Sequence, residues 1–154
     1  MSGFIAIGTT PTDDTIANDG FWPDVDVQAY RGHMRMDATV AQERLRASLT
    51  AAILSVNDEL AAWKALQGDA GHATLADVPA PQVNQTSRFM LLYQRAVACC
   101  AAAELTERYR SFDATDSANQ RADDLTPSID ELRRDQRWAI RDFLGTRRMT
   151  VELI

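Results

Sequence analysis

Apolar residues recur at three- and four-residue steps in two stretches of this chain, and this spacing predicts two amphipathic helices. The first stretch spans residues 45–63 and the second spans residues 129–143, with Gly68 and Gly145 as the expected helix stops. The first stripe consists of Leu45, Leu49, Ala52, Val56, Leu60 and Trp63. The second consists of Ile129, Leu132, Gln136, Ala139, Ile140 and Phe143.

Residues with cap preferences mark where helices are expected to begin. Thr39 and Gln42 have the spacing of a capping box before the first stripe. Thr126-Pro127 combines an N-cap residue with a proline suited to the first helical position before the second stripe. Asp26 is an acceptable N-cap for a short helix over residues 27–35. A further helical segment is predicted over residues 117–125, after a polar connection.

A third long helix is predicted from about residue 87 to 111. Residues 96–103 form an unbroken run of small apolar side chains, and residues 104–110 are mostly charged. Small side chains let neighbouring helices approach closely, so we expect this helix at the centre of a compact bundle. Its charged end, with Arg108, Tyr109 and Arg110, is expected to face solvent or a partner; alternatively, the Tyr109 ring closes the end of the core.

The two ends of the chain do not fit the helical pattern. Residues 1–24 are rich in glycine, proline, threonine and aspartate, yet they include Phe21 and Trp22. We interpret them as an extended arm that anchors on a neighbouring subunit, or alternatively as a frayed terminus. Residues 147–154 include Val151 and Leu153 in an alternating pattern that predicts a short strand or tail, which must pair with another segment.

The predicted fold class is therefore all-α, with one domain over residues 25–146. It is a helical bundle of three to four main helices with an extended N-terminal arm and a short C-terminal strand. At 154 residues, the chain is long enough for one domain with a substantial core. Residues 68–86, which contain Gly71, Pro79 and Pro81, are expected to be a connection without long elements.

The charge balance argues against a general nucleic-acid or membrane binder. The formal net charge is -6, which does not favour attraction to phosphate or to anionic lipid. Lys64 is the only lysine, and all other basic residues are arginine. Cys99 and Cys100 lie in the apolar run, so we expect buried thiols that suit a reducing cytosol. No signal peptide or membrane span is predicted.

Candidate catalytic and metal sites are weak. His33 and Asp37 have helical i, i+4 spacing, which is one metal-ligand or acid–base pair and no more. The carboxylates of Asp113, Asp116, Asp123 and Asp124 could bind Mg²⁺, but a solvated loop is the simpler interpretation. A metal-dependent hydrolase is kept as an alternative class, whereas the favoured prediction has no catalytic residue, metal or cofactor.

Arg133, Arg137 and Arg141 recur every four residues and are expected to share one face of the last helix. This face could bind acidic groups or phosphates on a partner. Alternatively, Asp130, Asp135 and the following Asp142 satisfy much of the charge within the helix, which contributes little per pair.

Short motifs along the chain resemble the head-completion protein family of peduoviruses, which are temperate contractile-tailed bacteriophages. The resemblance covers about residues 21–154, and its motifs lack catalytic meaning. The departures are the divergent arm, Trp22 where the family pattern has phenylalanine, and the scarcity of lysine. The matching residues are Phe21 to Asp26 (FWPDVD), Arg31, Met34, Arg35, Thr39, Val40, Arg44 to Arg46, Leu75 to Ala80, Tyr93, Arg95 to Val97, Glu107 to Arg110, Ser128 to Leu132, Arg134, Asp135 and Arg137 to Ala139.

The resemblance implies a structural protein of the virion neck that is made in the host cytoplasm. It implies an adaptor that docks under the portal after DNA packaging, stabilises the filled head and receives the tail. Its expected partners are other copies in a ring of about a dozen, the portal protein, and a tail-side neck or tail terminator protein. Packaged double-stranded DNA would pass through with weak, non-specific contact, since phosphate capture requires a cationic surface. A monomeric cytosolic helical binding module without a virion role is the alternative.

Overall fold

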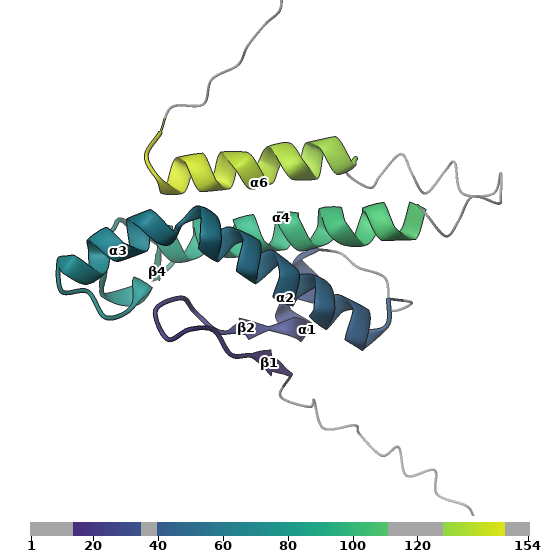
Figure 1. Ribbon diagram of the computed structural model, residues 1–154, viewed down its shortest axis with the longest axis horizontal. Coiled ribbons are helices and arrows are strands. Elements are labelled where there is room, and N and C mark those ends of the chain that lie inside the picture. The colour runs from purple at the N-terminus through teal and green to yellow at the C-terminus, as the bar shows by residue number, and fades with distance from the viewer. Residues whose placement is uncertain (1–13, 35–39, 111–127, 147–154) are drawn as a thin grey trace, which may run out of the picture.

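A computed structural model describes residues 14–34, 40–110 and 128–146, and within these ranges the chain is mainly helical (Figure 1). The three long helices are α2 (Gln42–Glu59), α4 (Arg88–Arg110) and α6 (Ile129–Phe143). The shorter ones are α1 (Val27–His33), α3 (Ala61–Asp69) and the 3-10 helix η1 (Leu75–Asp77). The prediction of a mainly helical fold is confirmed. The predicted helical segment 117–125 and the predicted strand in 147–154 lie outside the described residues.

Two short antiparallel strand pairs accompany the helices. Strand β1 (Thr15–Ile16) pairs with β2 (Val25–Asp26), and β3 (Gln82–Val83) pairs with β4 (Thr86–Ser87). Asn84 and Gln85 join β3 to β4 with positive φ angles of 49° and 62°. Two such residues form the tight turn that matches the twist of a hairpin. The hairpin covers the end of the predicted connection 68–86 and the first residue of the predicted central helix, Ser87, where no strand was predicted.

Helix α4 packs against both α2 and α6 and forms the centre of the described fold (Figure 1). Several of its small residues are fully enclosed, as shown by exposures of 1% for Ala96 and 0% for Ala101 and Ala103. The Ser48 hydroxyl of α2 donates a hydrogen bond to the Ala101 carbonyl oxygen at 2.9 Å, a contact that needs a close helix approach. The predicted central helix is thus confirmed, and its small side chains make room for helices on two sides.

Helix α6 has strong stop and start signals. Ser128 is the N-cap: its hydroxyl accepts from the Glu131 backbone N–H at 3.2 Å, and the Glu131 carboxylate accepts from the Ser128 N–H at 2.8 Å. This reciprocal capping box corrects the prediction that Thr126-Pro127 caps the helix. Gly145 has φ 68° just beyond the last turn, so the predicted stop is confirmed.

The first amphipathic stripe forms two helices rather than one. The chain turns at Leu60, whose φ and ψ are -99° and 3°, and α3 begins at Ala61. Leu60 is fully buried, and the change of direction brings the Trp63 ring to 4.6 Å from the Phe143 ring and 5.1 Å from the Phe89 ring. Gly68 was predicted to end the helix, but α3 continues through Gly68 to Asp69. The glycine that follows the helix with a positive φ, 92°, is Gly71.

The start of α2 corrects a second local prediction. Ala41 is the N-cap and makes no side-chain cap hydrogen bond, and Thr39 lies outside the described residues. The Gln42 amide instead donates to the Asp14 carboxylate at 2.6 Å and accepts from Gln28 at 2.8 Å. Gln42 therefore bonds to the N-terminal segment and α1 instead of the predicted capping box. At α1, the expected cap is confirmed, since the Asp26 carboxylate accepts from two backbone N–H groups.

Residues 14–26 are packed onto the helices, which corrects the prediction of an unpacked arm over residues 1–24. The β1–β2 pair places Ile16 and Val25 in the core, at 8% and 1% exposure. The turn between the strands buries Phe21 and Trp22. Residues 1–13 lie outside the described residues, so the arm prediction is now confined to them.

Candidate interaction surfaces

Phe21 and Trp22 were predicted to contact a partner, and the structure places them inside the subunit. They are 7% and 2% exposed. The Trp22 ring stacks on the Tyr93 ring with centroids 4.9 Å apart and an angle of 7° between the planes. Phe21 meets Trp22 edge-on at 4.9 Å. The prediction is wrong for these two residues because their rings complete the aromatic core with Trp63 and Phe143.

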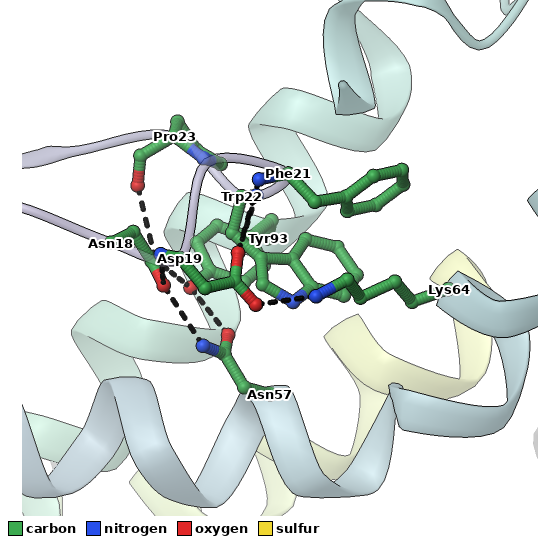
Figure 2. A network of polar contacts seen from close by, with 8 residues as sticks. All are labelled: Asn18, Asp19, Phe21, Trp22, Pro23, Asn57, Lys64 and Tyr93. Atoms are coloured by element: carbon green, nitrogen blue, oxygen red, sulfur yellow. Dashed lines mark hydrogen bonds and ion pairs between the residues drawn. The ribbon is translucent and has the colours of Figure 1, made fainter. Parts of the chain in front are cut away.

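A cyclic set of hydrogen bonds fixes the β1–β2 turn on α2 and α4 (Figure 2). The Asn18 amide donates to the Tyr93 hydroxyl oxygen at 2.9 Å, and that hydroxyl donates to Asn57 at 2.8 Å. The Asn57 amide closes the cycle by donating to Asn18 at 3.0 Å. Burial raises the pKa of Tyr93 to about 12, so its hydroxyl keeps the proton it donates.

Ion pairs hold the same segment from outside. The Lys64 ammonium of α3 lies 2.5 Å from an Asp19 carboxylate oxygen (Figure 2). Arg46 of α2 pairs with Asp14. Burial opposes ionisation of Asp19, but the Lys64 bond and the backbone N–H groups of Phe21 and Trp22 outweigh it and lower the pKa of Asp19. No periodic pattern in the sequence indicates these contacts, because they join residues far apart in the chain.

The charged end of α4 is partly neutralised within the subunit. Arg108 pairs with Glu104 one helical turn earlier at 2.5 Å, although the Arg108 side chain is 71% exposed. Glu107 accepts from Arg133 of α6 at 2.9 Å. Tyr109 and Arg110 belong to α4, but their side chains lie outside the described residues. Arg108 thus keeps an accessible guanidinium, and its role as an interface residue stays a prediction.

The three arginines of the predicted α6 face have different surroundings. Arg133 faces α4 through its bond to Glu107. Within the described part of the chain, the side chains of exposed Arg137 and partly exposed Arg141 make no hydrogen bond or ion pair. Trp138 lies beside them, and the Arg134 guanidinium sits 4.7 Å from its ring centroid. We call Arg137, Trp138 and Arg141 the α6 outer face.

A second surface, which sequence reasoning did not single out, lies on α2 and α3. Leu54 and Leu66 are 61% and 65% exposed, so each leaves most of a large apolar side chain open to solvent. The sequence pattern could have predicted this exposure, since Thr50, Leu54 and Asp58 recur every four residues on the side of the helix opposite the buried stripe. We call the following exposed residues the α2–α3 outer face: Thr50, Leu54, Asp58, Ala65, Leu66 and Asp69.

The remaining predicted site residues give little support for metal or thiol chemistry. His33 is exposed at the end of α1, while Asp37 and the four loop aspartates lie outside the described residues. The part of the chain that is described contains no group of three or more His, Cys, Asp or Glu residues placed to hold a metal ion. Cys100 is buried as predicted and Cys99 is half-buried, and burial raises the pKa of both thiols.

Two further points concern the ends of the chain and the membrane. Val151 and Leu153, predicted to make contacts from a C-terminal strand, lie outside the described residues. Of the helices that the structure describes, none combines the length and the apolar character needed to cross a bilayer.

Comparisons with known proteins agree with the resemblance seen in the motifs. The family model for the phage head completion protein (GPL) matches residues 16–154. The head completion/stabilization protein of Escherichia phage P2 is 40% identical over 139 residues, covering 90% of this chain and 82% of that protein. The probable head completion/stabilization protein of Haemophilus phage HP1 is 27% identical over 147 residues, covering 95% and 97%. No solved structure matches the chain. With the family model matching all but the first residues and a relative this similar over most of its length, the chain belongs to the phage head completion protein family.

Proposed function

We propose that this protein is a connector adaptor of the virion neck. It docks under the portal after DNA packaging, stabilises the filled head and provides the attachment site for the tail. The observation that carries this proposal is the family match, which spans residues 16–154 and therefore nearly all of the folded subunit. The names of the relatives in phages P2 and HP1 describe head completion and stabilization.

The structure supports an architectural role in two ways. The aromatic core and the Asn18–Asn57–Tyr93 cycle join three segments that are far apart in the sequence. The outer faces of α2–α3 and α6 carry exposed leucine and arginine and a half-buried tryptophan, which are side chains suited to contacts between proteins. The net charge of -6 is compatible with DNA moving past the subunit, because the duplex would not be held by a strong phosphate-binding surface.

The test is genetic complementation in the phage or prophage that carries this gene. With the gene interrupted, heads should package DNA but lose it to added nuclease and fail to join tails. A plasmid copy of the wild-type gene should restore nuclease protection, tail joining and infectivity, and the protein should cross-link to the portal in purified particles. Normal infectious particles without the gene, or absence of the protein from purified particles, would contradict the proposal and favour a cytosolic binding module.

A further inference from the structure

Two exposed faces of the subunit have complementary chemistry. Helix α2 contacts α4 through the Ser48–Ala101 hydrogen bond, whereas α6 contacts it through Arg133–Glu107 and Arg95–Asp135, the latter at 3.6 Å. Figure 1 shows α6 along one side of α4 and α2 crossing α4 at an angle. Helix α2 also meets α6 at one point, where the Gln136 amide lies 3.5 Å from the Glu59 carboxylate. The exposed residues of the two faces thus lie on different helices.

The α2–α3 outer face combines apolar and acidic groups. It holds two large, well exposed hydrophobic side chains, Leu54 and Leu66, at 61% and 65% exposure. Between residues 47 and 69 the only basic residue is Lys64, which pairs with Asp19 of its own subunit. The carboxylates of Asp58 and Asp69 are exposed and make no hydrogen bond or ion pair within the described ranges. This face thus presents negative charge beside apolar surface.

The α6 outer face has the opposite character. The guanidinium groups of Arg137 and Arg141 are left without acidic partners among the residues that the structure describes, in contrast to Arg133 and Arg134, which pair with Glu107 and Asp135. The half-buried ring of Trp138 lies on the same side of the helix. Tryptophan and arginine are the side chains that most often carry the energy of protein–protein contacts.

We propose that the α6 outer face of one copy binds the α2–α3 outer face of the next copy. Arg137 and Arg141 then pair with Asp58 and Asp69, and Trp138 packs against the exposed leucines. Because the two faces differ, the contact is head-to-tail, and head-to-tail contacts build closed rings when the rotation closes. This inference rests on the proposed adaptor function, and it names the surfaces by which the copies join.

Charge reversal with rescue tests this pairing in purified particles. Particles are made in cells that lack the wild-type gene and express the full chain, and copies of the protein per portal are counted by quantitative mass spectrometry. The variants are the double substitution R137E/R141E, the double substitution D58R/D69R, and all four substitutions together. All positions are at least partly exposed, and far-UV circular dichroism of each purified chain confirms that it folds.

Each double variant should lower the copy number by about tenfold, because reversal places like charges opposite each other. The fourfold variant should restore most of the loss, since both faces are again complementary. Matched controls with the charge kept, R137K/R141K and D58E/D69E, should stay near the wild-type level. The pairing is overturned if either reversed pair assembles normally or if the fourfold variant is as deficient as its parents. Absence of the wild-type chain from particles would instead reject the adaptor function itself.

Discussion

Replacing Trp22 by alanine is the sharpest test of the corrected position of the N-terminal segment. The Trp22 side chain is 2% exposed and touches the rings of Tyr93, Phe21, Trp63 and Phe143. Its indole N–H has no hydrogen-bond partner within the described residues, so the substitution removes packing without breaking such a bond. The cost is therefore the lost burial of the ring together with the cavity that remains.

The expected loss is large for a domain of this size. Truncating a buried tryptophan to alanine costs about 3–5 kcal/mol, out of a total stability of roughly 5–15 kcal/mol. With about 2–4 °C per kcal/mol for a chain near this length, the melting temperature should fall by roughly 10 °C. Urea unfolding of the purified chain, followed by circular dichroism at 222 nm, gives the free energy of unfolding directly.

A matched substitution separates packing from other effects. Trp22→Phe keeps a buried ring and removes the indole N–H, so it should cost clearly less than the alanine change, at most about 2 kcal/mol. If Trp22→Ala changes the free energy of unfolding by less than about 1 kcal/mol, the burial reasoning is refuted. A loss of partner binding at unchanged stability would restore Trp22 as an exposed interface residue.

The remaining predictions concern the same segment. Deleting residues 1–13 should leave the melting temperature nearly unchanged, since no described contact is lost. Deleting residues 1–20 also removes strand β1 and should lower the melting temperature by several degrees. Equal melting temperatures of the two truncated chains in calorimetry would contradict this prediction. Tyr93→Phe removes a hydroxyl that bonds to two asparagine side chains and should cost about 1–3 kcal/mol in urea unfolding, and an unchanged midpoint would count against the cycle. The pKa of Asp19 is lowered from its usual value of 3.8, so the ionised carboxylate stabilises the fold at pH values above that usual value. The difference in free energy of unfolding between wild type and Asp19→Asn should therefore shrink as the pH falls from about 5 to about 2. A difference that stays constant with pH would show that the charged pair with Lys64 is not the source of this stability.

Helices whose signals are local were predicted well. The inner side of α6 was given by its spacing, and Gln136, Ala139, Ile140 and Phe143 are buried. The predicted central helix, 87–111, differs from α4 by one residue at each end. The interaction surface was harder to predict. Arg133, Arg137 and Arg141 do lie on one helix as predicted, but their spacing does not reveal that Arg133 forms an ion pair with Glu107 of a different helix.

The sequence by itself determined which segments are helical, because the periodicity, the small-residue run of α4 and the stop at Gly145 act within a few residues of one another. It also determined the family, through motifs spread along the chain. Only the tertiary structure decided that the stripe breaks at Leu60 and that Phe21 and Trp22 are core residues. The reason is that burial of an aromatic ring depends on surfaces from distant segments, here Trp63, Tyr93 and Phe143, which no local pattern records.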